Sequence, residues 1–159
     1  MAVLIVLAAL ALSGCLFTPP EELEASVVGD YYDGDALHRP GQPCLLCHGA
    51  DAPRPEPAFE IAGTVYDEID SLEDEGVGGV LVIITDADGV ELVVTTNSAG
   101  NFYSARQLEF PLTVSIRRGD VVSTMQTLIW RNGSCAHCHG EKPDEASVGR
   151  VFLDEEMTP

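Results

Sequence analysis

Between residues 59 and 130 the chain repeats one pattern: a short segment of β-branched and aromatic residues, then turn-forming residues, at intervals of about ten residues. The clearest example is 80–85, Val-Leu-Val-Ile-Ile-Thr, which the turn signal Asp-Ala-Asp-Gly at 86–89 follows. The 3.6-residue spacing of an amphipathic helix is weak throughout this stretch. The pattern predicts a mainly β protein with a single antiparallel β-sandwich of about six or seven strands. The expected strands are 59–66, 79–85, 90–96, 101–104, 110–117 and 121–130.

Four of the five cysteines form two copies of one motif, C-x-x-C-H. Two thiols separated by two residues on one turn can each bond one vinyl group of a haem, and the histidine that follows then lies beneath the iron as an axial ligand. The spacing therefore predicts two covalently bound haems c, one at each motif. The residues are Cys44, Cys47 and His48 in the first motif, and Cys135, Cys138 and His139 in the second.

Three other interpretations of the cysteines stay open. Each C-x-x-C pair could form a disulfide in an oxidising compartment, or all four thiols could meet at one end of the sandwich around a structural zinc ion. Neither interpretation gives a role to His48 or His139. A thioredoxin-like redox pair is disfavoured, because no βαβ pattern surrounds either motif.

The sixth axial ligands are not fixed by any motif. Besides the two motif histidines the chain has His38 and His137, which makes both candidate sixth ligands. His38 precedes Cys44 in a predicted loop and could reach the first haem, with a solvated loop histidine as the alternative. His137 lies inside the second motif, points away from its own iron, and could reach only the other haem. Met125 is the chief methionine candidate, although its place in a predicted strand favours core packing.

The middle of the chain resembles a known family of β-sandwiches. The residues that carry the resemblance are 61–65 (Ile-Ala-Gly-Thr-Val), 76–82 (Gly-Val-Gly-Gly-Val-Leu-Val) and 95–103 (Thr-Thr-Asn-Ser-Ala-Gly-Asn-Phe-Tyr). They are similar to the carboxypeptidase regulatory-like, or transthyretin-like, family over about 70 of the 159 residues. The resemblance implies a sandwich that serves as an adaptor or spacer and assigns no catalytic residue.

The N-terminal residues have the pattern of an export signal with a lipid anchor. Residues 1–12 are almost all apolar, which is too short to span a bilayer and typical of a signal peptide. Leu12-Ser13-Gly14-Cys15 resembles the bacterial lipoprotein box, with Cys15 as the lipidated residue. The box departs from the usual pattern in that no Lys or Arg precedes the apolar run, which suggests a start upstream of Met1. A buried N-terminal helix is the alternative.

The resulting organisation has five parts. They are a lipoprotein signal peptide (1–14), a tether (15–28), a first haem-binding segment (29–58), the β-sandwich (59–130) and a second haem-binding segment (131–159). The haem-binding segments are rich in loop-forming residues and lie at both ends of the sandwich. Leu16, after the lipidated cysteine, lacks the aspartate typical of inner-membrane retention, which favours the outer membrane.

The net charge of −18 disfavours nucleic acid as a partner and favours proteins with basic docking surfaces. Together with two haems and a lipid anchor, it predicts a membrane-anchored cytochrome c that transfers electrons to redox partner proteins and is not an enzyme. A haem peroxidase activity stays open, because one iron could lack a sixth ligand. The alternative function is a non-redox surface lipoprotein whose sandwich binds a protein or a glycan, with the C-x-x-C pairs as disulfides or a zinc site.

Overall fold

The computed structural model describes residues 35–52, 58–144 and 147–153. The predicted signal peptide, the lipidation site Cys15 and the tether lie outside these residues. Within the described part, no helix is both long enough and apolar enough to cross a membrane.

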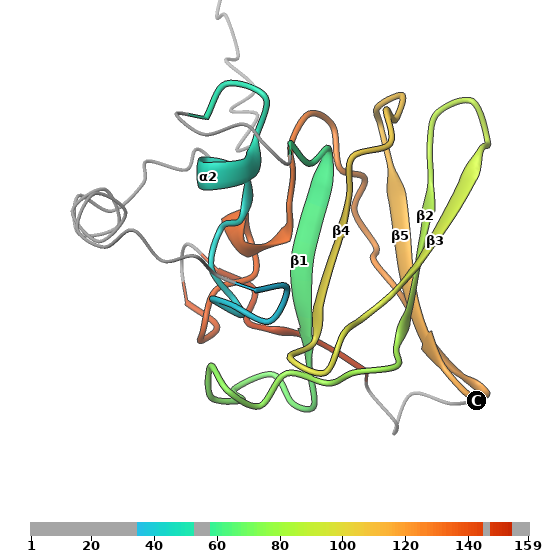
Figure 1. Cartoon of the computed structure of the whole chain (residues 1–159). Coiled ribbons are helices and arrows are strands. Elements are labelled where there is room, and N and C mark those ends of the chain that lie inside the picture. Colours follow the sequence, from blue (N-terminus) through green and yellow to red (C-terminus); the bar gives the residue numbers. More distant parts are fainter. Residues whose placement is uncertain (1–34, 53–57, 145–146, 154–159) are drawn as a thin grey trace, which may run out of the picture.

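The described residues form two β-sheets that face each other (Figure 1). The first sheet has the order β4-β1-β7, and β8 also pairs with β1. The second sheet has the order β3-β2-β5-β6. The strands are β1 (Ile61–Tyr66), β2 (Leu81–Thr85), β3 (Glu91–Thr95), β4 (Asn101–Ser104), β5 (Thr113–Arg118), β6 (Val121–Thr124), β7 (Gly133–Ser134) and β8 (Val151–Phe152). The predicted mainly β sandwich is confirmed.

Two details differ from the expected strands. The predicted strand at 121–130 is β6 only as far as Thr124, and the rest contributes a single bridge between Ile129 and Leu112. The second difference is that β7 and β8, which come from the segment after the predicted sandwich, run parallel to β1, whereas the second sheet is antiparallel throughout. The second motif segment therefore contributes backbone to the sandwich itself.

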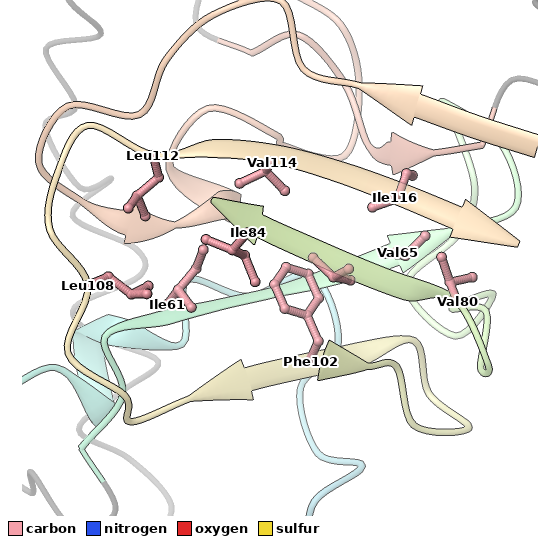
Figure 2. Close-up of a cluster of buried hydrophobic side chains, with 10 residues drawn as sticks. Ile61, Val65, Val80, Ile84, Phe102, Leu108, Leu112, Val114 and Ile116 are labelled. Atoms are coloured by element: carbon pink, nitrogen blue, oxygen red, sulfur yellow. The ribbon is translucent and has the colours of Figure 1, made fainter. Parts of the chain in front are cut away.

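The core lies between the two sheets (Figure 2). Side chains alternate between the two faces of a strand, and accordingly every second residue of β2 and of β5 is buried. The inward positions hold aliphatic residues and one phenylalanine, whose burial supplies the main driving force for folding. They are Ile61, Val65, Val80, Val82, Ile84, Phe102, Leu108, Leu112, Val114 and Ile116.

Strand β1 is an exception to this alternation, because all six of its residues are buried. Its inner face, with Ile61 and Val65, contributes to the core. Its outer face, with Thr64 and Tyr66, is covered by Arg150 and by the first motif segment, whose helix α2 (Leu45–His48) lies beside β1 and away from the second sheet (Figure 1). Cys135 of the second motif packs at Gly63 of the same strand. This double coverage brings both motifs to one strand.

Candidate functional site

Both C-x-x-C-H motifs form a single helical turn with the same backbone hydrogen bonds. The first turn is α2, and the second is the 3-10 helix η1 (Cys135–His137). In each, the carbonyl of the first cysteine accepts from the second cysteine and from the histidine, so that the first cysteine and the histidine share one face. The N···O distances are 3.1 and 2.8 Å for Cys47 and His48 donating to Cys44, and 3.2 and 2.9 Å for Cys138 and His139 donating to Cys135.

The first motif is held against the sandwich by an aromatic stack. The His48 ring stacks on Phe59 with centroids 4.8 Å apart, and Phe59 stacks on Tyr103 of β4 at 4.6 Å. The Phe59 N–H also donates to the carbonyl of His48 at 2.6 Å. These contacts fix α2 at the start of β1.

The structure brings His38 close to His48, with ring centroids 5.9 Å apart. One metal ion between two imidazoles, with each bond about 2 Å long, needs centroids roughly 6 Å apart, so this separation fits the predicted ligand pair. His38 Nδ1 lies against the carbonyl of Asp35, which only accepts, so Nδ1 carries the proton and Nε2 keeps its lone pair. Asn101 holds His38 in place, because its Nδ2 donates a hydrogen bond to the main-chain carbonyl of His38 at 3.1 Å.

In the second motif, Cys135 packs into space that a glycine leaves on β1. A Cβ at Gly63 would lie 2.7 Å from Cys135 Cβ and 2.8 Å from its Sγ. Burial, together with the neighbouring thiols of Cys44 and Cys138, raises the pKa of Cys135 to about 12. Burial also raises the pKa of Cys44. The Cys135 thiol is therefore protonated at neutral pH and weakly reactive.

His139 has the surroundings of a metal-ligating histidine. Its Nδ1 lies 3.0 Å from the carbonyl of Gly149, which fixes the proton on Nδ1 and leaves the Nε2 lone pair for a metal. Burial lowers its pKa, and the hydrogen bond to Gly149 opposes this shift in part. Ser147 organises the loop, since its Oγ accepts from Gly140 N at 2.6 Å and from Gly149 N at 3.1 Å. The neutral imidazole is the form that binds iron.

The other two predicted sixth ligands, His137 and Met125, lie elsewhere in the structure. His137 lies on η1, where burial and the positive charge of Arg131 lower its pKa. Met125 follows β6, and its N–H donates to Val114 at 3.0 Å, in the sheet that carries neither motif. Trp130, shortly before the second motif, is 68% exposed.

The donor set fits haem attachment. The sulfur atoms of Cys44, Cys47 and Cys135 form no disulfide bond among the described residues, and each motif adds an imidazole on the face of its first cysteine. Among the described residues, no three His, Cys, Asp or Glu side chains form a group that could hold a metal ion by themselves. The haem, zinc and disulfide interpretations of the sequence remain predictions.

Two residues near the motifs had no role in the sequence analysis, Tyr66 and Arg150. The Arg150 guanidinium lies over the Tyr66 ring, 4.3 Å from its centroid, and only 6% of Arg150 is exposed. Among the described residues, the buried Tyr66 hydroxyl has no hydrogen-bond partner. The one signal in the sequence was that Arg150 is among only eight Lys and Arg residues of a strongly acidic chain.

Comparison with known proteins gave no protein family, no curated protein and no solved structure that matches this chain. The resemblance to carboxypeptidase regulatory-like sandwiches therefore stays a prediction.

Proposed function

We propose that the chain is a membrane-anchored electron carrier with two covalently attached haems c. The observation that carries the proposal is the repeated turn: both motifs present a cysteine and a histidine on one face through the same backbone hydrogen bonds, and both lie at β1. Such a repeat has a direct use if each turn holds the same cofactor. A bound haem would supply an iron centre that takes up and releases one electron.

The residues of each motif have distinct roles in this proposal. Cys44 and Cys47 would hold the first haem by thioether bonds, and His48 and His38 would bind its iron. Cys135 and Cys138 would hold the second haem, and His139 would bind its iron. The carbonyls of Asp35 and Gly149 keep Nδ1 of His38 and His139 protonated and thereby direct Nε2 to the metal.

The rest of the chain suits electron exchange. The motif residues are only partly buried, so haems held there would keep exposed edges for brief encounters with partner proteins. The net charge of −18 would steer partners with basic docking surfaces. The sandwich acts as the spacer between the haems and the membrane, to which lipidated Cys15 attaches the protein after export, with the outer membrane favoured.

The test is the mass and spectrum of the full chain, expressed in a bacterium that attaches haem c. We expect the intact mass to include two haems and the pyridine haemochrome spectrum to be of the c type. The double variants C44A/C47A and C135A/C138A should each lose one haem and half of the haemochrome absorbance. The matched control, C15A, removes a cysteine outside the motifs and should keep both haems. A wild-type polypeptide without added haem mass contradicts the proposal.

A further inference from the structure

Arg150 is a buried cation without an anionic partner among the residues that the structure describes. An arginine keeps its charge at every physiological pH, and a buried charge is costly unless it is paired. In the part of the chain that the structure describes, its side chain makes two contacts: the Tyr66 ring, and a long hydrogen bond of 3.4 Å from Nε to the carbonyl of Ser71. No carboxylate of the described residues forms an ion pair with it. Most of the guanidinium donors are thus open to a further acceptor.

The Tyr66 hydroxyl is a second polar group without a partner at the same place. It is buried, with 2% of the residue exposed, and has no hydrogen-bond partner among the described residues. Gly41 passes directly over both groups with φ +76°, and a Cβ there would overlap Tyr66 Oη and Arg150 Nη1. Three segments distant in sequence therefore converge on an Arg donor and a Tyr donor, and a side chain at position 41 would overlap both donors.

The carboxylates of Glu73 and Glu141 lie near Tyr66 but do not pair with Arg150. Burial raises the pKa of Tyr66, Arg150 opposes this shift, and the negative charges of Glu73 and Glu141 add to it, with a resulting pKa of about 12. Neither glutamate lies within ion-pair distance of Arg150. The Glu73 carboxylate instead accepts from Gln42 Nε2 at 3.3 Å.

We propose that Arg150 and Tyr66 bind a carboxylate, and that this carboxylate is a propionate of a haem attached at one of the two motifs. The inference rests on the proposed function. A guanidinium recognises a carboxylate with paired N–H donors, and a phenol adds one more hydrogen bond. The site touches both motifs: Gly41 lies three residues before Cys44, and Arg150 follows Gly149, whose carbonyl holds His139. Each haem brings two propionates, which are anions that need such donors when they are buried.

The test is isotope-edited infrared spectroscopy of the full chain, with the haem propionate carboxyl carbons labelled with ¹³C through a labelled haem precursor. The difference between labelled and unlabelled protein isolates the propionate carboxylate bands from those of Glu73 and Glu141. We expect R150Q to shift one set of label-sensitive bands and to lower the midpoint potential of one haem, because a nearby positive charge stabilises the ferrous form. R117Q makes the same charge change at an exposed residue of β5 and should leave the bands in place.

The outcomes separate this inference from the proposed function. The propionate site is wrong if R150Q leaves the label-sensitive bands unchanged, or changes only carboxylate bands that do not respond to the label. In either case the proposed electron-transfer function still stands. Wild-type protein without haem mass overturns the proposed function as well. If R150Q does not fold, Y66F removes one oxygen only, and we expect it to shift the same label-sensitive bands by a smaller amount. Unchanged bands in Y66F would then overturn the inference.

Discussion

The two motif segments reach β1 in different ways. The first, residues 35–52, is held mostly by side chains: Thr64 Oγ1 accepts from Gly41 N at 2.8 Å, and Asn101 Nδ2 donates to the His38 carbonyl at 3.1 Å. Neither α2 nor η1 has a fully buried residue, so the two segments differ in their backbone pairing. The second segment enters the first sheet as β7 and β8, with backbone pairing on both sides of its motif.

This difference predicts which of the two motifs can open locally while the sandwich stays folded. Regions held by few buried contacts open locally at low free-energy cost, whereas strands paired in a sheet open only with the sheet. The first motif should therefore be able to detach while the core stays folded. The second motif, with Cys135 against the core, should move only when β1 loses its neighbours.

The largest expected effect concerns the reactivity of Cys135 in protein made without haem. Its pKa of about 12, against an ordinary value of 9.0, makes the thiolate fraction about 1000-fold lower at pH 8. Because a thiolate of higher pKa is also more nucleophilic, we expect iodoacetamide to alkylate Cys135 about 50-fold more slowly than a small-molecule thiol of ordinary pKa, as followed by peptide mass spectrometry. In urea the rate should rise to the reference. A fast reaction of the folded protein would show that the second motif is not docked as described.

The next effect is expected at Gly63. In G63A the new Cβ would overlap the Cys135 side chain, and overpacking of this kind costs about 1–3 kcal/mol. Urea denaturation should show this loss, and hydrogen exchange should increase in residues 133–139. The control T95A changes an exposed position of β3 and should stay within about 0.5 kcal/mol of wild type. An unchanged free energy of unfolding in G63A would mean that Cys135 is free to move aside.

A smaller effect is expected at Thr64, whose hydroxyl donates to Asn101 Oδ1 at 2.7 Å and accepts from Gly41 N. T64V keeps the shape and leaves both partners unsatisfied, at a cost of about 1–2 kcal/mol. Hydrogen exchange should increase in residues 35–43 and stay unchanged in 133–153. The matched control is T124V, which removes a hydroxyl that pairs with Ser115 on the exposed side of the second sheet. Equal changes in both motif segments would refute their independent attachment.

The smallest change in folding stability is expected at His38, although its spectral effect should be clear. If His38 is the sixth ligand of the first haem, H38Q converts one of two haems from a low-spin to a high-spin visible spectrum. H137Q changes a histidine that the structure does not place beside His48, and it should leave both spectra as they are. Identical spectra of H38Q and wild type would remove His38 from the ligand set.

The sequence was sufficient to predict features that local chemistry determines. The turn at 97–100 follows from Asn97, whose Oδ1 accepts from the N–H groups of Ala99 and Asn101, and from Gly100, which adopts φ +77°. The motif turns follow from their own spacing. Strands β2, β3 and β4 also lie where alternation and β-branched residues predict them.

Contacts between residues far apart in the chain could not be predicted from the sequence. Strands β7 and β8 have two residues each, which is too short for any periodicity, and they form only because β1 offers an open edge. The contact of Arg150 with Tyr66 joins residues far apart in the chain and has no local signature. The proximity of His38 to His48 depends on Asn101, a residue that the sequence assigned to a strand after a turn.

The parallel pairing of β1 with β7 and β8 also sets an order of events during folding. Ile61 pairs with Gly133 and Val65 with Val151, across roughly 70 and 85 residues of intervening chain. Such distant pairings form late, because closing a long loop costs entropy before any contact repays it. In a chain that emerges from its N-terminus, the edge of β1 therefore stays open until residues 133–152 have been made. Up to that moment the Cys135 thiol is fully accessible to covalent modification, and afterwards the completed sheet leaves it only partly accessible.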